Sequence, residues 1–158
     1  MEQINNIASV LGIISAAVTI FSALKIKSYY EKITTLYSVE KLAVAEKKAI
    51  EAKSKYQELK KMYFENRGRT GSAYFKKYME IDSILDEVMH SLPTEYSEIF
   101  EHIKNTKDII NKATEKEFIE ERSQSFLELG TSLDILYSNL KSQKTKKQER
   151  NVKSIATR

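Results

Sequence analysis

The residues best suited to binding chemistry lie in one short segment, ENRGRTGSAYFKKY, at positions 65–78. Arg67 and Arg69 alternate with glycines here, and a guanidinium group can hold a phosphate through two parallel hydrogen bonds. Gly68 and Gly71 allow the turns that direct backbone N–H groups toward an anion at a helix start. The segment therefore predicts an anion-binding turn.

The rest of this segment adds cationic and aromatic side chains. Lys76 and Lys77 contribute positive charge, and Tyr74 and Tyr78, one helical turn apart, are spaced to stack on a nucleotide base. Ser72 is placed to cap the following helix. The predicted ligand-binding residues are Arg67, Gly68, Arg69, Thr70, Ser72, Tyr74, Lys76 and Lys77. The competing interpretation is an ordinary polar loop between helices, with surface arginines and core tyrosines.

Side chains that could support catalysis are scarce. The chain has no cysteine and two histidines, His90 and His102, which are not clustered with other metal ligands. It contains no G-x-S-x-G, Walker A or G-x-G-x-x-G pattern. We therefore expect a binding protein that is not an enzyme and holds no metal or cofactor.

An uncharged run at positions 7–24, IASVLGIISAAVTIFSAL, stands out in a chain that is 30% charged. As a helix it would reach about 27 Å, close to the roughly 30 Å hydrocarbon core of a bilayer. Lys25, Lys27 and Lys32 come directly after it, and the positive-inside rule places the C-terminal part of the chain in the cytoplasm. Because residues 1–3 carry no lysine or arginine, a cleaved signal peptide is disfavoured. The run predicts a single-pass transmembrane anchor.

Small residues give this run two distinct faces. One is a small-xxx-small ridge that favours self-association, formed by Ala8, Gly12 and Ala16. The other consists of hydroxyls at Ser15, Thr19 and Ser22. These hydroxyls either bond back to their own helix or face partner helices or a narrow aqueous path, and both alternatives stay open.

The remainder predicts an all-α fold, because glycine (4) and proline (1) are rare and no strand-like alternation is present. We expect a symmetric oligomer, since parallel anchors in one membrane concentrate the copies. The expected domains are a transmembrane anchor (1–25), a long helix or stalk (26–65), a helical ligand-binding domain (66–140) and a basic tail (141–158).

Apolar spacing places the individual helices. The stalk carries two stripes that fall out of phase near Ser38, which indicates a kink or a new N-cap. Its second half, rich in Lys, Glu and Ala, is expected to be solvated or to pack thinly against copies of itself. The next helix runs to about residue 90, with a core face of Phe75, Tyr78, Ile81, Leu85, Val88 and Leu92.

The last helices come after Pro93. A short helix carries Tyr96, Ile99, Phe100 and Ile103, and a turn is expected near Asn105 and Thr106. The final helix is expected from about residue 114 to Leu140. It presents Phe118, Ile119, Phe126, Leu129, Leu133, Leu136 and Leu140. Gly130 inside it is expected to allow close helix approach.

The tail at 141–158 carries a net charge of +6, whereas residues 1–140 carry −2. The three interpretations that remain open are a solubilising or frayed end, a contact with anionic lipid, and a contact with nucleic acid.

In its architecture the chain resembles the small membrane effectors of type III CRISPR systems. The resemblance rests on the anchor IASVLGIISAAVTIFSAL and the basic segment ENRGRTGSAYFKKY, and it covers the whole chain at the level of architecture. It implies a homotetramer in the bacterial inner membrane whose cytosolic domain binds a cyclic oligoadenylate, namely cyclic tetra-adenylate. It also implies that ligand binding leads to membrane disruption in antiviral defence.

Two other functions remain open from the sequence. One is a membrane-tethered helical scaffold of phage or plasmid origin that docks a protein partner. The other is a holin-like or toxin peptide, against which the size of the helical domain argues.

Overall fold

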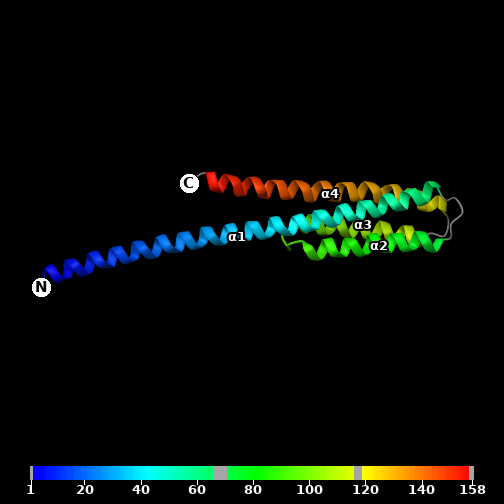
Figure 1. Cartoon of the computed structure of the whole chain (residues 1–158). Helices are drawn as coiled ribbons and strands as arrows, with labels where there is room; N and C mark the ends of the chain where they lie inside the picture. Colours follow the sequence, from blue (N-terminus) through cyan, green and yellow to red (C-terminus); the bar gives the residue numbers. More distant parts are fainter. Residues whose placement is uncertain (1, 66–70, 116–118, 157–158) are drawn as a thin grey trace. The chain divides into compact units, whose positions relative to one another are not determined.

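The computed structural model describes the backbone of residues 2–65, 71–115 and 119–156, with side chains over 15–64, 72–115 and 124–152. Its elements are α1 (Glu2–Glu65), α2 (Gly71–Ser91), α3 (Ser97–Glu115) and α4 (Ile119–Ala156), drawn in Figure 1. The all-α prediction is confirmed. The chain divides into two units, Met1–Tyr37 and Ser38–Arg158.

The first unit consists of one helix, the N-terminal part of α1. Nearly all its described side chains are exposed, including Val18, Phe21 and Leu24 at 60–65%. In the part of the chain that the structure describes, no helix is both long and apolar enough to cross a membrane. Residues 7–14 of the predicted anchor lie outside the described side chains.

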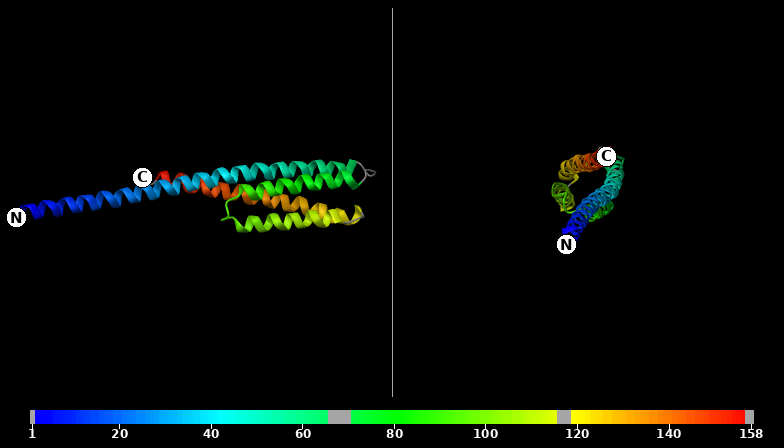
Figure 2. Two further views of the ribbon diagram at one scale, coloured as in Figure 1. Left: turned by 90° about the horizontal axis from the view of Figure 1, so that it is seen from below. Right: turned by 90° about the vertical axis from the view of Figure 1, so that its left-hand side faces the viewer.

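The second unit is an antiparallel four-helix bundle formed by α1 from Ser38 onward, α2, α3 and α4. Figure 2 shows that successive helices run in opposite directions. The connections between successive helices are short, and short connections are typical of neighbouring antiparallel helices. Polar contacts between neighbours are Lys48–Glu87 (2.6 Å, α1–α2), Lys107–Asp82 (3.3 Å, α2–α3), Thr106–Ser132 (2.7 Å, α3–α4) and Lys53–Asp134 (2.6 Å, α4–α1).

The core of the bundle follows most of the predicted apolar spacing. The predicted α2 face is buried at Tyr78, Ile81, Leu85, Val88 and Leu92, and the α4 face is buried at Phe126, Leu129, Leu133, Leu136 and Leu140. Phe75 is an exception, because its side chain is 52% exposed. Phe118 and the Ile119 side chain lie outside the described residues.

The alanine face in the second half of α1 is buried in the bundle, which corrects the expectation that this part packs only thinly against copies of itself. Ala45, Ala49 and Ala52 are at most 1% exposed and belong to the bundle core. Small side chains bury little area each but let helices approach closely. Helix is also assigned on both sides of Ser38, so no new helix begins there and the predicted N-cap is wrong.

Helix α3 is continuous where a turn was expected. The Thr106 hydroxyl is fully buried and donates a hydrogen bond to the His102 carbonyl (2.8 Å), as threonine does inside helices. It also bonds to the Ser132 hydroxyl on α4. This buried partner explains why a polar pair, Asn105 and Thr106, does not end the helix.

Helix α4 extends four turns beyond the predicted end at Leu140. Its inward face continues through Lys144, which pairs with the largely buried Glu46 on α1, and Lys147, which pairs with Glu95 at 3.0 Å. Lysine stems cover the bundle while their charged ends reach carboxylates. The predicted basic tail is therefore helical as far as Ala156, and two of its charges are neutralised within the bundle.

Candidate ligand-binding site

The predicted anion-binding turn connects the last turn of α1 to the first turn of α2. Arg67, Gly68, Arg69 and Thr70 lie outside the described residues, whereas both flanking helix ends are described. The hydroxyl of Tyr74 donates a hydrogen bond to the carbonyl of Met62 at 2.9 Å. This carbonyl is one of the last four of α1, which lack intrahelical donors. Tyr74 thus ties the two helix ends together.

The rings of Tyr74 and Tyr78 do not lie where a base could stack on them. Tyr74 is 6% exposed and meets Tyr63 edge-on, with 5.2 Å between ring centroids, while Tyr78 is 1% exposed. Both belong to the buried stripe of α2. In the described conformation neither ring is open to a base, because three- and four-residue spacing turns both rings into the core.

The exposed aromatic rings at this end of the bundle are Phe64 and Phe75. Phe64 is 68% exposed in the last turn of α1, and Phe75 is 52% exposed in the first turn of α2. Phe75 was predicted to lie in the core, and Phe64 was not predicted to have a role. Their position beside the turn was the only sequence signal, because periodicity alone does not separate an outward phenylalanine from a core one.

The two nominated lysines lie in different surroundings. Lys76 is exposed, as are Lys60 and Lys61 near the end of α1. Lys77 instead pairs with Glu58 on α1 at 2.7 Å and with Glu80 on α2 at 2.8 Å. Of the two nominated lysines, Lys76 is therefore the one whose charge is exposed to solvent. It lies one helical turn after Ser72, which is also exposed.

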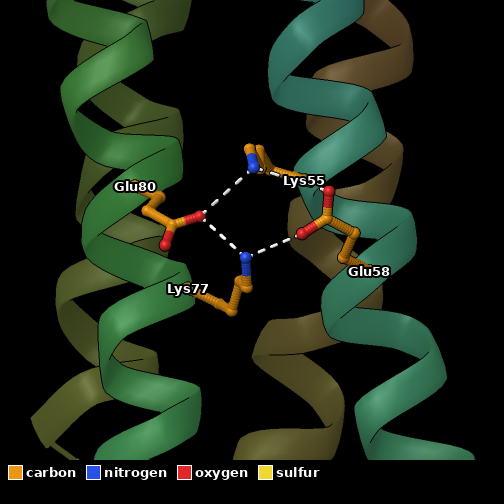
Figure 3. Close-up of polar contacts among 4 residues, drawn as sticks. All are labelled: Lys55, Glu58, Lys77 and Glu80. Atoms are coloured by element: carbon orange, nitrogen blue, oxygen red, sulfur yellow. Dashed lines mark hydrogen bonds and ion pairs between the residues drawn. The ribbon is translucent and has the colours of Figure 1, made fainter.

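The pairing of Lys77 belongs to a four-residue ion-pair network, shown in Figure 3. Lys55 adds a third and fourth contact, at 3.5 Å to both Glu58 and Glu80. Hydrogen bonds from Lys77 lower the pKa of Glu58 and of Glu80, and the bond to Glu58 raises the pKa of Lys77. The network joins α1 to α2, and the Lys77 ammonium group is paired with glutamates of both helices.

This network predicts a loss of stability in acid. Because the pKa of both glutamates is below its ordinary value of 4.5, their contribution is present above about pH 4.5 and is lost as the pH falls below it. The groups are partly solvated, so we expect at most about 1 kcal/mol per pair. Urea unfolding at pH 5.5 and pH 3 measures the drop. Lys77→Gln should make the loss of stability between the two pH values smaller. Lys76→Gln, at the exposed neighbour, should leave that loss unchanged. An equal loss in both variants would contradict the role of Lys77 in the network.

The two histidines make structural contacts, His90 within α2 and His102 from α3 to α4. The Nδ1 atom of His90 lies 2.7 Å from the Asp86 carbonyl in the last turn of α2, a typical C-terminal contact. The Nε2 atom of His102 lies 2.9 Å from the Ser132 carbonyl and 3.3 Å from the Ser132 hydroxyl. Since the shorter contact requires Nε2 to carry hydrogen, this nitrogen is not placed to take a proton from Ser132. Ser132 also lies within α4, where backbone N–H groups are already bonded.

The described surface also has hollows that are lined by other residues than those nominated for the ligand. One of about 420 Å³ is lined by Ile109, Leu127 and Ile135 between α3 and α4. Another, of about 320 Å³, lies at the start of α3 and is lined by Glu95, Glu98 and Lys147. Burial and the adjacent Glu95 raise the pKa of Tyr96 beside it to about 12, so this phenol stays neutral. Two carboxylates make this second hollow unsuitable for an anion.

Over residues 2–65, 71–115 and 119–156, no group of three or more His, Cys, Asp or Glu side chains is placed to hold a metal ion. Comparison of the chain with protein-family models, with curated proteins and with solved structures finds no match.

Proposed function

We propose that this protein is a membrane-anchored, non-enzymatic effector whose helical bundle binds an anionic nucleotide at the turn between α1 and α2. The proposal for the anchor rests on the uncharged run of residues 7–24 followed by Lys25 and Lys27. The same lysines support a bundle on the cytoplasmic side, and the resemblance to CRISPR-associated membrane effectors supports the bacterial inner membrane as the location.

The observation that carries the ligand proposal is the composition of the bundle end. Two arginines occupy the five-residue connection, and the flanking helix ends expose Lys60, Lys61 and Lys76. The first N–H groups of α2 lack intrahelical acceptors and favour negative charge. Phe64 and Phe75 take the place of the buried tyrosines as exposed rings beside this turn. Charge and aromatic surface together favour a ligand with phosphates and bases.

The ligand and assembly that we propose rest on the resemblance of the sequence to the CRISPR-associated membrane effectors. They are a cyclic oligoadenylate, in particular cyclic tetra-adenylate, and a homotetramer whose symmetry matches that ligand. Ligand binding would favour one of two oligomer states and lead to membrane disruption. The exposed basic residues near the end of α4, Lys146 and Arg150, would contact anionic lipid.

Binding of cyclic tetra-adenylate to the full chain in detergent tests the ligand proposal. Arg67→Ala and Arg69→Ala should each weaken binding about tenfold or more, because a charge-assisted hydrogen bond contributes about 1.5–3 kcal/mol. Lys112→Ala, an exposed charge in the last turn of α3, should leave the affinity unchanged. Parent-level affinity in both arginine variants, or no binding by the parent chain, contradicts the site.

A second candidate function is a membrane-tethered scaffold that docks a protein partner. It is favoured by the structural roles of Tyr74 and Lys77, two of the nominated residues, which hold α1 and α2 together. A scaffold would bind no cyclic nucleotide, and replacing its arginines would change stability by no more than about 0.5 kcal/mol.

A further inference from the structure

The part of α1 just before the bundle carries an exposed apolar face. Ile26, Tyr30 and Ile33 are 68%, 71% and 65% exposed, and Tyr29 and Leu36, on the adjacent edge of the helix, are 59% and 55% exposed. The unit to which they belong, Met1–Tyr37, contains no described element besides this helix. Burying large apolar side chains of this kind is favourable, because it removes their surface from water. The face therefore requires a partner outside its own unit.

The spacing along this face is that of a coiled-coil seam. Ile26, Tyr30 and Ile33 alternate steps of four and three residues, the pattern of a and d positions in a heptad. Residues on the opposite side are polar, such as Glu31 and Thr35. A 3.5-residue period keeps a straight seam only against another helix that supercoils with it. Another helix fits this spacing as the partner.

The same period continues toward the N-terminus with small residues. Counting in the same steps from Ile26 toward the N-terminus gives Ala23, Thr19, Ala16 and Gly12, all small. The series is thus small within the uncharged run and large after it. Small residues permit close helix approach in lipid, whereas large apolar knobs drive association in water. A partner with small residues opposite the small ones and large residues opposite the large ones allows close approach in the first half and enclosed apolar knobs in the second.

We propose that this partner is a second copy of the chain, in parallel and in register, with residues 26–36 forming a coiled-coil stalk. Only parallel, in-register copies bring equivalent positions together along the whole series. In this arrangement Lys27 flanks the seam and faces Ser22 of the next copy, so like charges do not meet. The apolar width, which includes Tyr29 and Leu36, is the three-in-seven face of helix bundles.

The exposed side chains of residues 26–36 supply much of the area that a stable interface needs. Tyrosine buries at least about 150 Å² when enclosed, so Tyr29 and Tyr30 supply roughly 300 Å² per copy. The three aliphatic residues Ile26, Ile33 and Leu36 bring the stalk toward the about 800 Å² per partner of a standard interface. The inference deepens the oligomer of the proposed function and rests on it, but it does not depend on the identity of the ligand.

Cysteine cross-linking of the full chain tests the seam, because the chain has no cysteine of its own. Ile26→Cys and Ile33→Cys, each reconstituted alone in lipid and oxidised, should form disulfide-linked dimers, since parallel copies bring equal positions near the about 4 Å Cβ–Cβ separation of a disulfide. Thr35→Cys, on the opposite face, is the matched control and should react at least about tenfold more slowly.

Three results would overturn the proposal. They are equal cross-linking at positions 33 and 35, no cross-linking at 26 and 33, and cross-linking only when the Ile26→Cys and Ile33→Cys proteins are mixed, which indicates antiparallel helices. Circular dichroism establishes that each variant keeps its helix content. Binding of cyclic tetra-adenylate by the same samples separates the proposals. Seam cross-links without binding refute the ligand alone, and binding without cross-links refutes the stalk alone.

Discussion

Replacing Leu136 by alanine is expected to destabilise the bundle by about 2–5 kcal/mol, the usual range for a fully buried leucine. Leu136 is 0% exposed and belongs to the apolar core. Truncation removes the buried side chain and leaves a cavity that tightly packed neighbours fill only in part. Urea unfolding of the full chain, followed by circular dichroism, measures the loss.

The preceding residue supplies a matched control for Leu136. Ile135 is 45% exposed on the outer face of α4, so Ile135→Ala should cost far less, about 1 kcal/mol or below. The two positions differ by one residue in register and by the side of the helix on which they lie. Similar losses for both variants would mean that α4 is rotated relative to the described bundle.

Replacing Gly130 by valine is expected to destabilise the bundle by about 3 kcal/mol through overpacking against α1. A Cβ atom at position 130 would lie 2.6 Å from Cζ and 2.9 Å from Cε1 of Tyr56, far inside van der Waals contact. The ring of Tyr56 is restrained, because it stacks on Phe126 with 4.9 Å between centroids. Thr131→Val, on the exposed neighbour, is the control and should change stability by no more than about 0.5 kcal/mol.

The effect of Gly130→Ala should change sign with the residue at position 56. With Tyr56 present, the clash outweighs the about 1 kcal/mol that alanine gains over glycine in a helix, so the variant is destabilised. In a Tyr56→Leu background the ring is gone, and the same substitution should stabilise the protein. A double-mutant cycle measures this coupling. A coupling energy near zero would show that Gly130 is not kept small by Tyr56.

The candidate site was only partly accessible to sequence reasoning. Segment 65–78 was correctly located at a helix connection, because glycines and arginines interrupt two periodic stretches. The sequence pattern assigns Tyr74 to the surface and Phe75 to the core, whereas the structure has Tyr74 buried and Phe75 exposed, because periodicity does not distinguish two adjacent aromatic residues. The bundle turns Tyr74 inward to cap the end of α1 and leaves Phe75 exposed. The distinction depends on where α1 lies.

The charged residues show the same limit. Lys76 and Lys77 are adjacent residues of the same type, so the sequence does not distinguish them. In the structure Lys77 lies between two carboxylates, one of which belongs to α1. Likewise Lys144 and Lys147 belong to a basic run for which composition leaves open a solubilising end, a lipid contact and a nucleic-acid contact. Their partners, Glu46 and Glu95, are far away in sequence. No local pattern indicates a pair of this kind.

The sequence by itself determined the all-α class, the helix connections after residues 65 and 91, most of the core stripes and the close approach at Gly130. These features arise from local periodicity and from the rarity of helix breakers, which act within a few residues. The tertiary structure alone decided the burial of the alanine face, the continuity of α3 through Thr106 and the helical end of α4. Each of these depends on a partner from another helix: neighbours for Ala49, Ser132 for Thr106 and Glu46 for Lys144. A buried polar contact or a thin apolar stripe becomes favourable only when that partner is brought within reach.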